Sequence, residues 1–167
     1  MAELMELPRL RAVLEEYGAA VAEQYKSNLI RDGRPTTDNS LIQSIRTFVE
    51  VNGQGYEVKM SLNDYWKYIE YGTKGWLTGN TSRKFPPPAA IEHWIEVKPG
   101  LPKPSTIQER KSLAYLIGRK IRDFGTKGKA DLTEAKMTIT EQYRERIAAA
   151  LGADMVNYIR KVIAPTS

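Results

Sequence analysis

The side chain best suited to acid–base chemistry at neutral pH is the chain's single histidine, His93. It stands in the segment Glu92-His93-Trp94-Ile95-Glu96 without a second histidine, so the two-histidine zinc signature of metalloproteases is absent. The chain has no cysteine and no Gly-x-Ser-x-Gly motif, which removes two common nucleophile patterns and cysteine-bound metals. The sequence therefore predicts no catalytic residue, no metal site and no cofactor, and an enzyme that depends on His93 is the least favoured alternative.

A short repeat is the other motif that could bind a ligand. Residues 71–75 read Tyr-Gly-Thr-Lys-Gly and residues 124–128 read Phe-Gly-Thr-Lys-Gly. Neither matches a nucleotide-binding P-loop, which needs two glycines four residues apart, then Lys and Ser or Thr, between a strand and a helix. Both repeats follow an expected helix, so we interpret them as glycine-capped helix ends with exposed basic loops.

Positive charge is concentrated in two zones, although the formal net charge is only +5. Residues 110–129 contain seven Lys and Arg residues against one acid, and residues 71–91 contain three with no acid. Such zones are typical of a solvated helix face. They would equally suit contact with an acidic protein surface or with the phosphates of a nucleic acid, so a basic nucleic-acid-binding protein that uses the 110–129 face stays as the alternative function.

Aromatic residues cluster in residues 65–71, where a short helix beside a hairpin favours a role in packing. Trp76 and Phe85 stand instead in an otherwise polar loop and are candidates for contact with a partner. Together with the basic side chains they form the set of candidate subunit contacts. The set comprises Lys74, Trp76, Arg83, Lys84, Phe85, Lys111, Arg119, Arg122, Lys127 and Lys129.

The elements that must position these residues follow from hydrophobic periodicity. Apolar residues at steps of three and four predict a long helix over 8–30, and two alternating runs around a Gly-rich turn predict an antiparallel hairpin over 45–62. Further helices are expected over 65–71, 89–98 and 106–124, joined by a loop over 72–88 and a Pro/Gly linker over 99–104. The last of these helices begins with a capping box and carries Leu113, Ile117, Ile121 and Phe124 on one face.

The C-terminal part also favours helix, over 141–150 and 154–163, with a break expected at Gly152. Residues 136–140 fit either a third strand or a helix, because Thr138, Ile139 and Thr140 prefer strands. We therefore predict an α+β fold. A small antiparallel sheet, the hairpin plus one or two further strands, packs against the long first helix and further helices in a domain over 1–140, and 141–167 form a helical extension.

Targeting and membrane signals are not expected. The acidic start, Met1 to Glu6, lacks the layout of a secretory signal, and no apolar run approaches the roughly 20 residues of a membrane span.

The order and spacing of several segments resemble the tail-completion or head–tail joining (neck) proteins of tailed double-stranded DNA bacteriophages. The resemblance covers about residues 45–137 and the preceding long helix. The segments that carry it are 65–73, 85–88, 91–95, 114–121, 125–128 and 132–135.

The resemblance implies a non-enzymatic virion protein of the neck or tail, assembled in the bacterial cytoplasm. Its partners would be copies of itself in a ring of about six or twelve, neighbouring portal, connector or tail proteins, and double-stranded DNA that passes through the channel without sequence recognition. Ring contacts join two different surfaces of the subunit, for which the basic helix face and the acidic first helix are the candidates.

Overall fold

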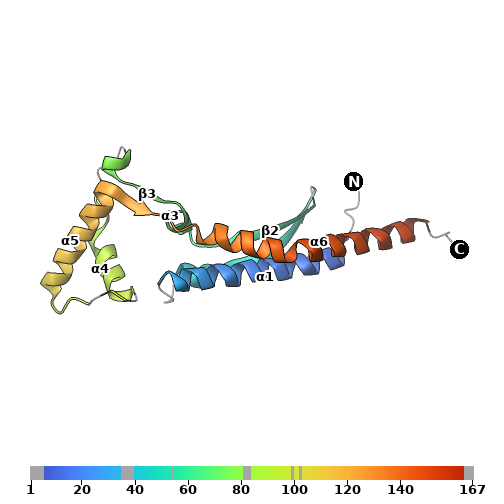
Figure 1. Ribbon diagram of the computed structural model, residues 1–167, viewed down its shortest axis with the longest axis horizontal. Helices are drawn as coiled ribbons and strands as arrows, with labels where there is room; N and C mark the ends of the chain where they lie inside the picture. Colours follow the sequence, from blue (N-terminus) through green and yellow to red (C-terminus); the bar gives the residue numbers. More distant parts are fainter. Residues whose placement is uncertain are drawn as a thin grey trace. The chain divides into compact units, whose positions relative to one another are not determined.

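The computed structural model describes residues 6–34, 40–53, 55–80, 84–98, 100–101 and 103–163. The chain divides into two compact units (Figure 1). Unit 1 combines Met1–Lys26, Ile45–Leu62 and Thr133–Ser167, and unit 2 combines Ser27–Ser44 and Asn63–Leu132. The predicted α+β class is confirmed, as are the long first helix, the hairpin and the helical C-terminal part.

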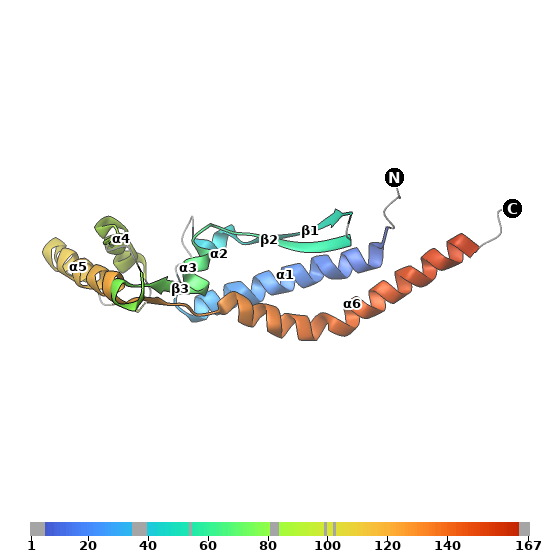
Figure 2. The same ribbon diagram turned by 90° about the horizontal axis from the view of Figure 1, so that it is seen from above.

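Unit 1 has three layers. The helix α1 (Pro8–Arg31) lies between a hairpin of β1 (Arg46–Asn52) and β2 (Gly55–Ser61) on one side and the helix α6 (Asp131–Ile163) on the other (Figure 2). The strands are antiparallel, with Val49 opposite Val58. Because a two-stranded hairpin is marginal alone in water, α1 supplies the packing that it needs.

The start of α1 is held by groups from both neighbouring layers. The backbone N–H of Leu7 donates to the Tyr56 hydroxyl on β2, at 2.8 Å. The N–H of Leu10, in the first turn, donates to the buried carboxylate of Asp154 on α6, at 2.9 Å. The first N–H groups of a helix have no partner within the helix, so these two contacts satisfy donors that would otherwise be orphaned.

The helix α6 is continuous, so the predicted break at Gly152 is wrong and the ambiguity over residues 136–140 resolves as helix. Ala135 and Ile139 are both buried and lie four residues apart, which is helical spacing. Glycine inside a helix costs only about 1 kcal/mol relative to alanine, too little to end a helix that has strong helix formers on both sides.

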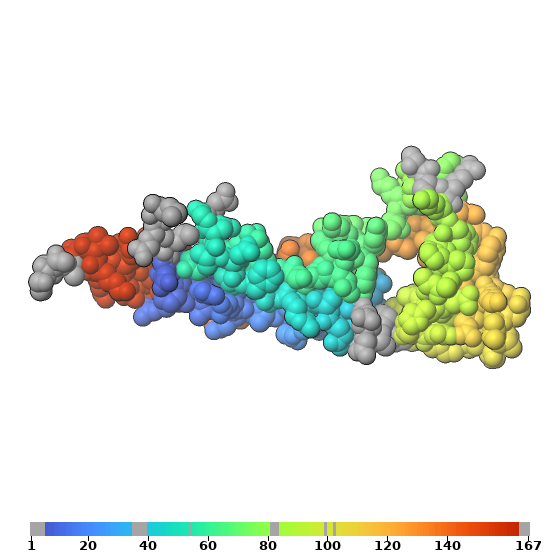
Figure 3. All heavy atoms as spheres, turned by 180° about the vertical axis from the view of Figure 1, so that it is seen from behind, coloured from blue at the N-terminus to red at the C-terminus, as the bar shows by residue number. Residues whose placement is uncertain are grey.

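Unit 2 is built on a pair of helices, α4 (Pro88–Val97) and α5 (Ile107–Phe124), whose atoms are in contact in Figure 3. Their core contains Ile91, Ile95 and Ala114. The helix α5 begins with the predicted capping box: the Thr106 hydroxyl accepts from the N–H of Glu109, and the Glu109 carboxylate accepts from the N–H of Thr106.

The predicted apolar stripe of α5 is confirmed in part, because Leu113 and Ile117 are partly buried against the core of Ile91, Ile95 and Ala114. Ala114 and Gly118 are its buried residues, whereas Phe124 is exposed. A Cβ added at Gly118 would lie 2.4 Å from the ring of Phe85, so Phe85 occupies the space that a larger residue would fill. The sequence did not indicate this contact, because Gly118 has no side chain and Phe85 reaches it from outside the helix.

The two repeats, expected as separate loops, form a second antiparallel sheet. The strands β3 (Gly72–Lys74) and β4 (Gly125–Lys127) pair with Thr73 opposite Thr126, and the two hydroxyls lie 3.0 Å apart. Gly72 and Gly125 have φ of +73° and +78°, and an added Cβ would lie 2.1 and 1.9 Å from a carbonyl oxygen of the opposite strand. We call this pair of strands the clasp.

Short elements complete unit 2. The helix α2 (Leu41–Ser44) follows α1, the helix α3 (Trp66–Glu70) leads into β3, and the 3-10 turn η1 (Trp76–Thr78) follows β3. The predicted helix over 65–71 is thus confirmed, and the predicted loop over 72–88 contains a strand and a turn.

The close contact in the clasp predicts that alanine lowers the free energy of unfolding at Gly125 but not at Gly53. Gly125→Ala should lower the free energy of unfolding by at least about 1–3 kcal/mol, since alanine is strained at positive φ and its Cβ meets a backbone oxygen. Urea unfolding followed by circular dichroism measures the change. Gly53→Ala is the control, because nothing lies within 4 Å of its added Cβ, and it should stay within about 0.5 kcal/mol. Equal losses would contradict the role given to the clasp.

Candidate interaction surface

The end of α5 and the turn η1 present large apolar side chains to solvent. Leu77 is 63% exposed, Phe124 59% and Leu116 52%. The Thr78 hydroxyl is 3.4 Å from the carbonyl oxygen of Phe124, so η1 is fixed beside the end of α5. Exposed apolar residues on anchored elements are typical of a surface that another protein covers.

A shallow depression of about 480 Å³ lies on the same helix. We call it the α5 depression; it is lined by Leu116, Arg119, Lys120, Asp123 and Phe124. Its lining combines apolar side chains with two exposed cations, which suits a partner that offers both an apolar group and an acidic one.

Three of the seven basic residues in 110–129 are neutralised by acids of unit 2. Arg110 pairs with Glu96, Arg122 with Asp123 at 2.7 Å, and Lys129 with Asp32 at 3.2 Å. The hydrogen bond from Arg122 also lowers the pKa of Asp123 and raises that of Arg122. Lys111, Arg119, Lys120 and Lys127 remain exposed, so the basic zone is weaker than its sequence suggests.

Two of the predicted contact residues pack against each other. The Phe85 ring stacks on Tyr115 with centroids 5.6 Å apart, and the Arg122 guanidinium lies 5.9 Å from the Phe85 centroid. Phe85 is therefore half-buried against α5 and is not an exposed loop residue. Arg122 is likewise held by Phe85 and Asp123.

The other candidates fall in different places. Lys74 and Lys127 are exposed on the two strands of the clasp, and Trp76 is 38% exposed in η1. Lys84 is exposed, and Arg83 lies outside the described residues. On α1, the acids proposed as a complementary surface are paired within the chain: Glu15 with Arg11, Glu16 with Arg146 and Glu23 with Lys26.

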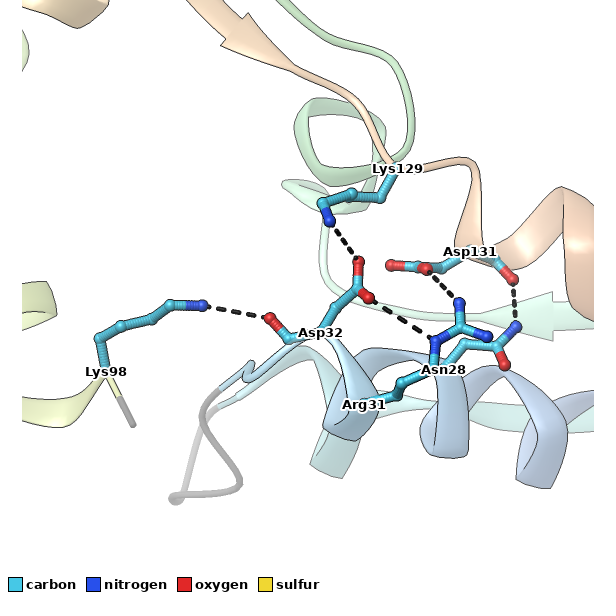
Figure 4. A network of polar contacts seen from close by, with 6 residues as sticks. All are labelled: Asn28, Arg31, Asp32, Lys98, Lys129 and Asp131. Atoms are coloured by element: carbon cyan, nitrogen blue, oxygen red, sulfur yellow. Dashed lines mark hydrogen bonds and ion pairs between the residues drawn. The ribbon is translucent and has the colours of Figure 1, made fainter. Parts of the chain in front are cut away.

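A polar network around the buried Asn28 and Asp131 connects the segment after the clasp to the end of α1 (Figure 4). The Asn28 side-chain amide donates to the backbone oxygen of Asp131 at 3.0 Å, and an Arg31 nitrogen lies 3.6 Å from the Asp131 carboxylate. Lys98 donates to the backbone oxygen of Asp32 at 3.2 Å, while Lys129 pairs with the Asp32 carboxylate. Burial lowers the pKa of Lys98.

Two carboxylates meet at the start of α6 in unit 2. Glu70 is buried and accepts the N–H of Leu132 at 2.9 Å, which satisfies a helix N-terminal donor. Asp131 is fully buried, and neither of its carboxylate oxygens has a hydrogen-bond partner among the described residues. Burial raises the pKa of Asp131, the nearby Asp32 and Glu70 raise it further, and Arg34 and Arg31 oppose the increase.

Sequence reasoning missed this network because its acids looked like ordinary surface residues. A partial signal existed, since Glu70 lies within an aromatic-rich helix and Asp131 directly precedes the apolar Leu132. In the part of the chain that the structure describes, no three His, Asp or Glu side chains are placed to hold a metal ion. Among the same residues, no helix is long and apolar enough to cross a membrane.

Comparison with known proteins gives no relative. No family model, no curated protein and no solved structure matches this chain.

The Asp131 carboxyl predicts an unusual dependence of stability on pH. Because its pKa is raised in the folded state, folding is favoured below the ordinary pKa and loses this contribution as pH rises through the raised value. Asp131→Asn should therefore stabilise the protein at neutral pH and lose that advantage in acid. Thermal unfolding across the acid-to-neutral range measures this.

Asp123→Asn is a matched control, for which we expect the opposite dependence of stability on pH. The pKa of Asp123 is lowered by Arg122, so its contribution is present at neutral pH and is lost as pH falls. The variant should be less stable than the parent at neutral pH and equal to it in acid. The same pH trend in both variants would contradict the assignment for Asp131.

Proposed function

We propose that this chain is a non-enzymatic structural subunit of a bacteriophage virion, a ring-forming component of the head–tail connector or tail terminus. It would join portal-side and tail-side components around the DNA channel. The observation that carries the proposal is the α5 depression, where the exposed Leu116 and Phe124 lie with Arg119 and Lys120. The exposed Leu77 belongs to η1, which contacts the end of α5 through Thr78. The order of sequence segments that resembles phage neck proteins supports it.

The chemistry of this surface suits contact between subunits. Three large apolar side chains are each more than half exposed on elements that the clasp and the α4–α5 core hold in place. A neighbour that covers them gains the free energy of apolar burial, about 25 cal/mol for each Å² removed from water. The flanking cations then favour an acidic neighbour and fix its orientation.

A ring requires a heterologous contact, in which two different surfaces of the subunit meet. The α5 depression is proposed as one of them. The acids of α1 are a poor complement because each has a partner on its own chain. We therefore expect the surface that meets the α5 depression to consist mainly of apolar groups, with a smaller contribution from acidic side chains.

Imaging tests the proposal directly. Virions that contain this chain should show a closed ring of its copies on the portal–tail axis, with the stoichiometry counted from the symmetry of the density. Virions without the chain at the neck or tail would overturn the proposal.

Substitutions test the surface itself. Leu116→Glu with Phe124→Glu should abolish incorporation into the ring, because a carboxylate would be buried in the contact. The melting temperature should change little, since both side chains are exposed in the subunit. Ile107→Glu, at the exposed start of the same helix, is the control and should retain incorporation. Incorporation of the double variant at the normal level would contradict the role of the α5 depression.

DNA binding by the isolated chain would favour the alternative function. It would appear as affinity that falls steeply with salt, with a smaller slope after neutralisation of Lys111, Arg119 and Lys120. The ion pairs of Arg110, Arg122 and Lys129 argue against a strong interaction of this kind.

A further inference from the structure

Both strands of the β1–β2 hairpin are edge strands, because their sheet has two strands in the part of the chain that the structure describes. In an antiparallel pair, alternate residues of a strand direct their backbone N–H and C=O groups to opposite sides. Residues 47–51 of β1 therefore present such groups on the side away from β2, and no other described segment makes a backbone hydrogen bond to them. A row of this kind is a template for another β-strand.

The outer edge of β1 lacks features that commonly prevent such pairing. Edge strands in folded proteins are often very short, bulged or interrupted by proline. The strand β1 spans the seven residues Arg46–Asn52 without proline, and its register with β2 is continuous. Four of these seven residues are exposed, against two of the seven in β2. Of the two edges of the hairpin, that of β1 is therefore the more open.

Three side chains make the outer edge of β1 complementary to itself. Arg46, Phe48 and Glu50 are alternate residues, so they lie on one face of the sheet. All three are exposed, and Phe48 is 47% exposed although it is the largest apolar residue of the strand. In a second copy turned end for end, each Arg46 would lie opposite a Glu50, and the two Phe48 rings would lie opposite each other.

The charges within the hairpin leave this complementarity in place. Glu50 shares Lys59 with Glu57, and the two acids lie directly opposite each other in the register. One cation therefore serves two acids, and like charges opposite each other in a ladder are unfavourable. Arg46 lies opposite the uncharged Ser61, and its guanidinium donates to a backbone carbonyl oxygen at 2.8 Å. An arginine brought to Glu50 from a second copy would balance the second acid.

The position of α1 allows two hairpins to lie side by side. A Cβ added at Gly18 of α1 would lie 3.0 Å from Val58 and 3.3 Å from Thr47, so the helix lies over both strands. Neighbouring strands are about 4.8 Å apart, which would place the centres of two adjoining hairpins about 10 Å apart. Packed helices are separated by about 8–10 Å. Two copies of α1 would therefore fit next to each other on one face of a four-stranded sheet.

We propose that the outer edge of β1 pairs antiparallel with the same edge of a second copy of this chain, with Phe48 opposite Phe48 and Arg46 opposite Glu50. The neighbouring registers that keep the same faces together set Phe48 opposite a charged residue, so the side chains select one register. The contact is isologous, with one edge meeting its own copy. It therefore differs from the heterologous ring contact and does not depend on it.

The mass of the full chain in solution tests the proposal. Sedimentation velocity over a wide range of concentrations should show a monomer converting to a dimer. Arg46→Glu and Glu50→Arg should each weaken the dimer about tenfold, because each change sets like charges opposite each other at two places in the contact. An equimolar mixture of the two variants should recover the dimer, since residue 46 of each chain then faces a residue 50 of opposite charge. A misfolded variant could not give this recovery.

Glu57→Arg is the matched control. Glu57 is exposed on the same face and lies beside the same Lys59, but it belongs to β2, so the variant should leave the dimer intact. Far-ultraviolet circular dichroism should give the parent spectrum for all three variants. A chain that is monomeric at every concentration would overturn the proposal, as would a mixture that recovers no dimer. Loss of the dimer in Glu57→Arg but not in Glu50→Arg would assign the contact to β2 and overturn it as well.

Cross-linking tests the register, because the chain has no native cysteine. Opposite residues of an antiparallel pair have Cα atoms about 4.5–5.5 Å apart, a separation that a disulfide can span. Phe48→Cys should therefore form a covalent dimer under mild oxidation. Ser61→Cys, on the same face of β2, should stay a monomer under the same conditions. A covalent dimer that forms more readily through position 61 than through position 48 would contradict the proposed register and edge.

Discussion

The approach of two backbones in the clasp is the constraint on which the rest of unit 2 depends. At Gly72, Gly75, Gly125 and Gly128 an added Cβ would lie within 2.5 Å of backbone from the opposite repeat or the residues beside it. The contact also fixes what is attached to it, because the N–H groups of Lys129 and Ala130 donate to the carbonyls of Ile69 and Glu70. Gly125 is also the C-cap of α5, as the sequence predicted, and its N–H donates to the carbonyl of Ile121. The pairing of the two repeats explains in addition why glycines recur at all four positions, which a phosphate loop does not.

Carboxylates from elsewhere in the chain hold the starts of both long helices. Asp154 of α6 accepts an N–H from the first turn of α1, and Glu70 of α3 accepts one from the first turn of α6. Each acid is buried, so its desolvation is offset by a charge-assisted hydrogen bond and by the helix dipole. Asp131 lacks that hydrogen bond, so burial disfavours its charged form and raises its pKa, and the nearby Asp32 and Glu70 add to the increase.

Periodicity predicted the elements whose signal extends over many residues: α1, the β1–β2 hairpin, α4 and the capped start of α5. Periodicity failed where contacts between residues that are far apart in the sequence determine the structure. The clasp strands are three residues each and have no period to detect, and Phe85 fills the space above Gly118 from outside the helix. The charge of the candidate surface was predicted only in part, because some of its cations pair with acids from other segments of the chain. Arg110 and Lys129 are neutralised by Glu96 and Asp32, which are distant in sequence.

The α5 depression suits a contact whose orientation is set by charge. The depression mixes apolar side chains with Arg119, Lys120 and Asp123, and such a surface gains orientation and salt sensitivity from its charges.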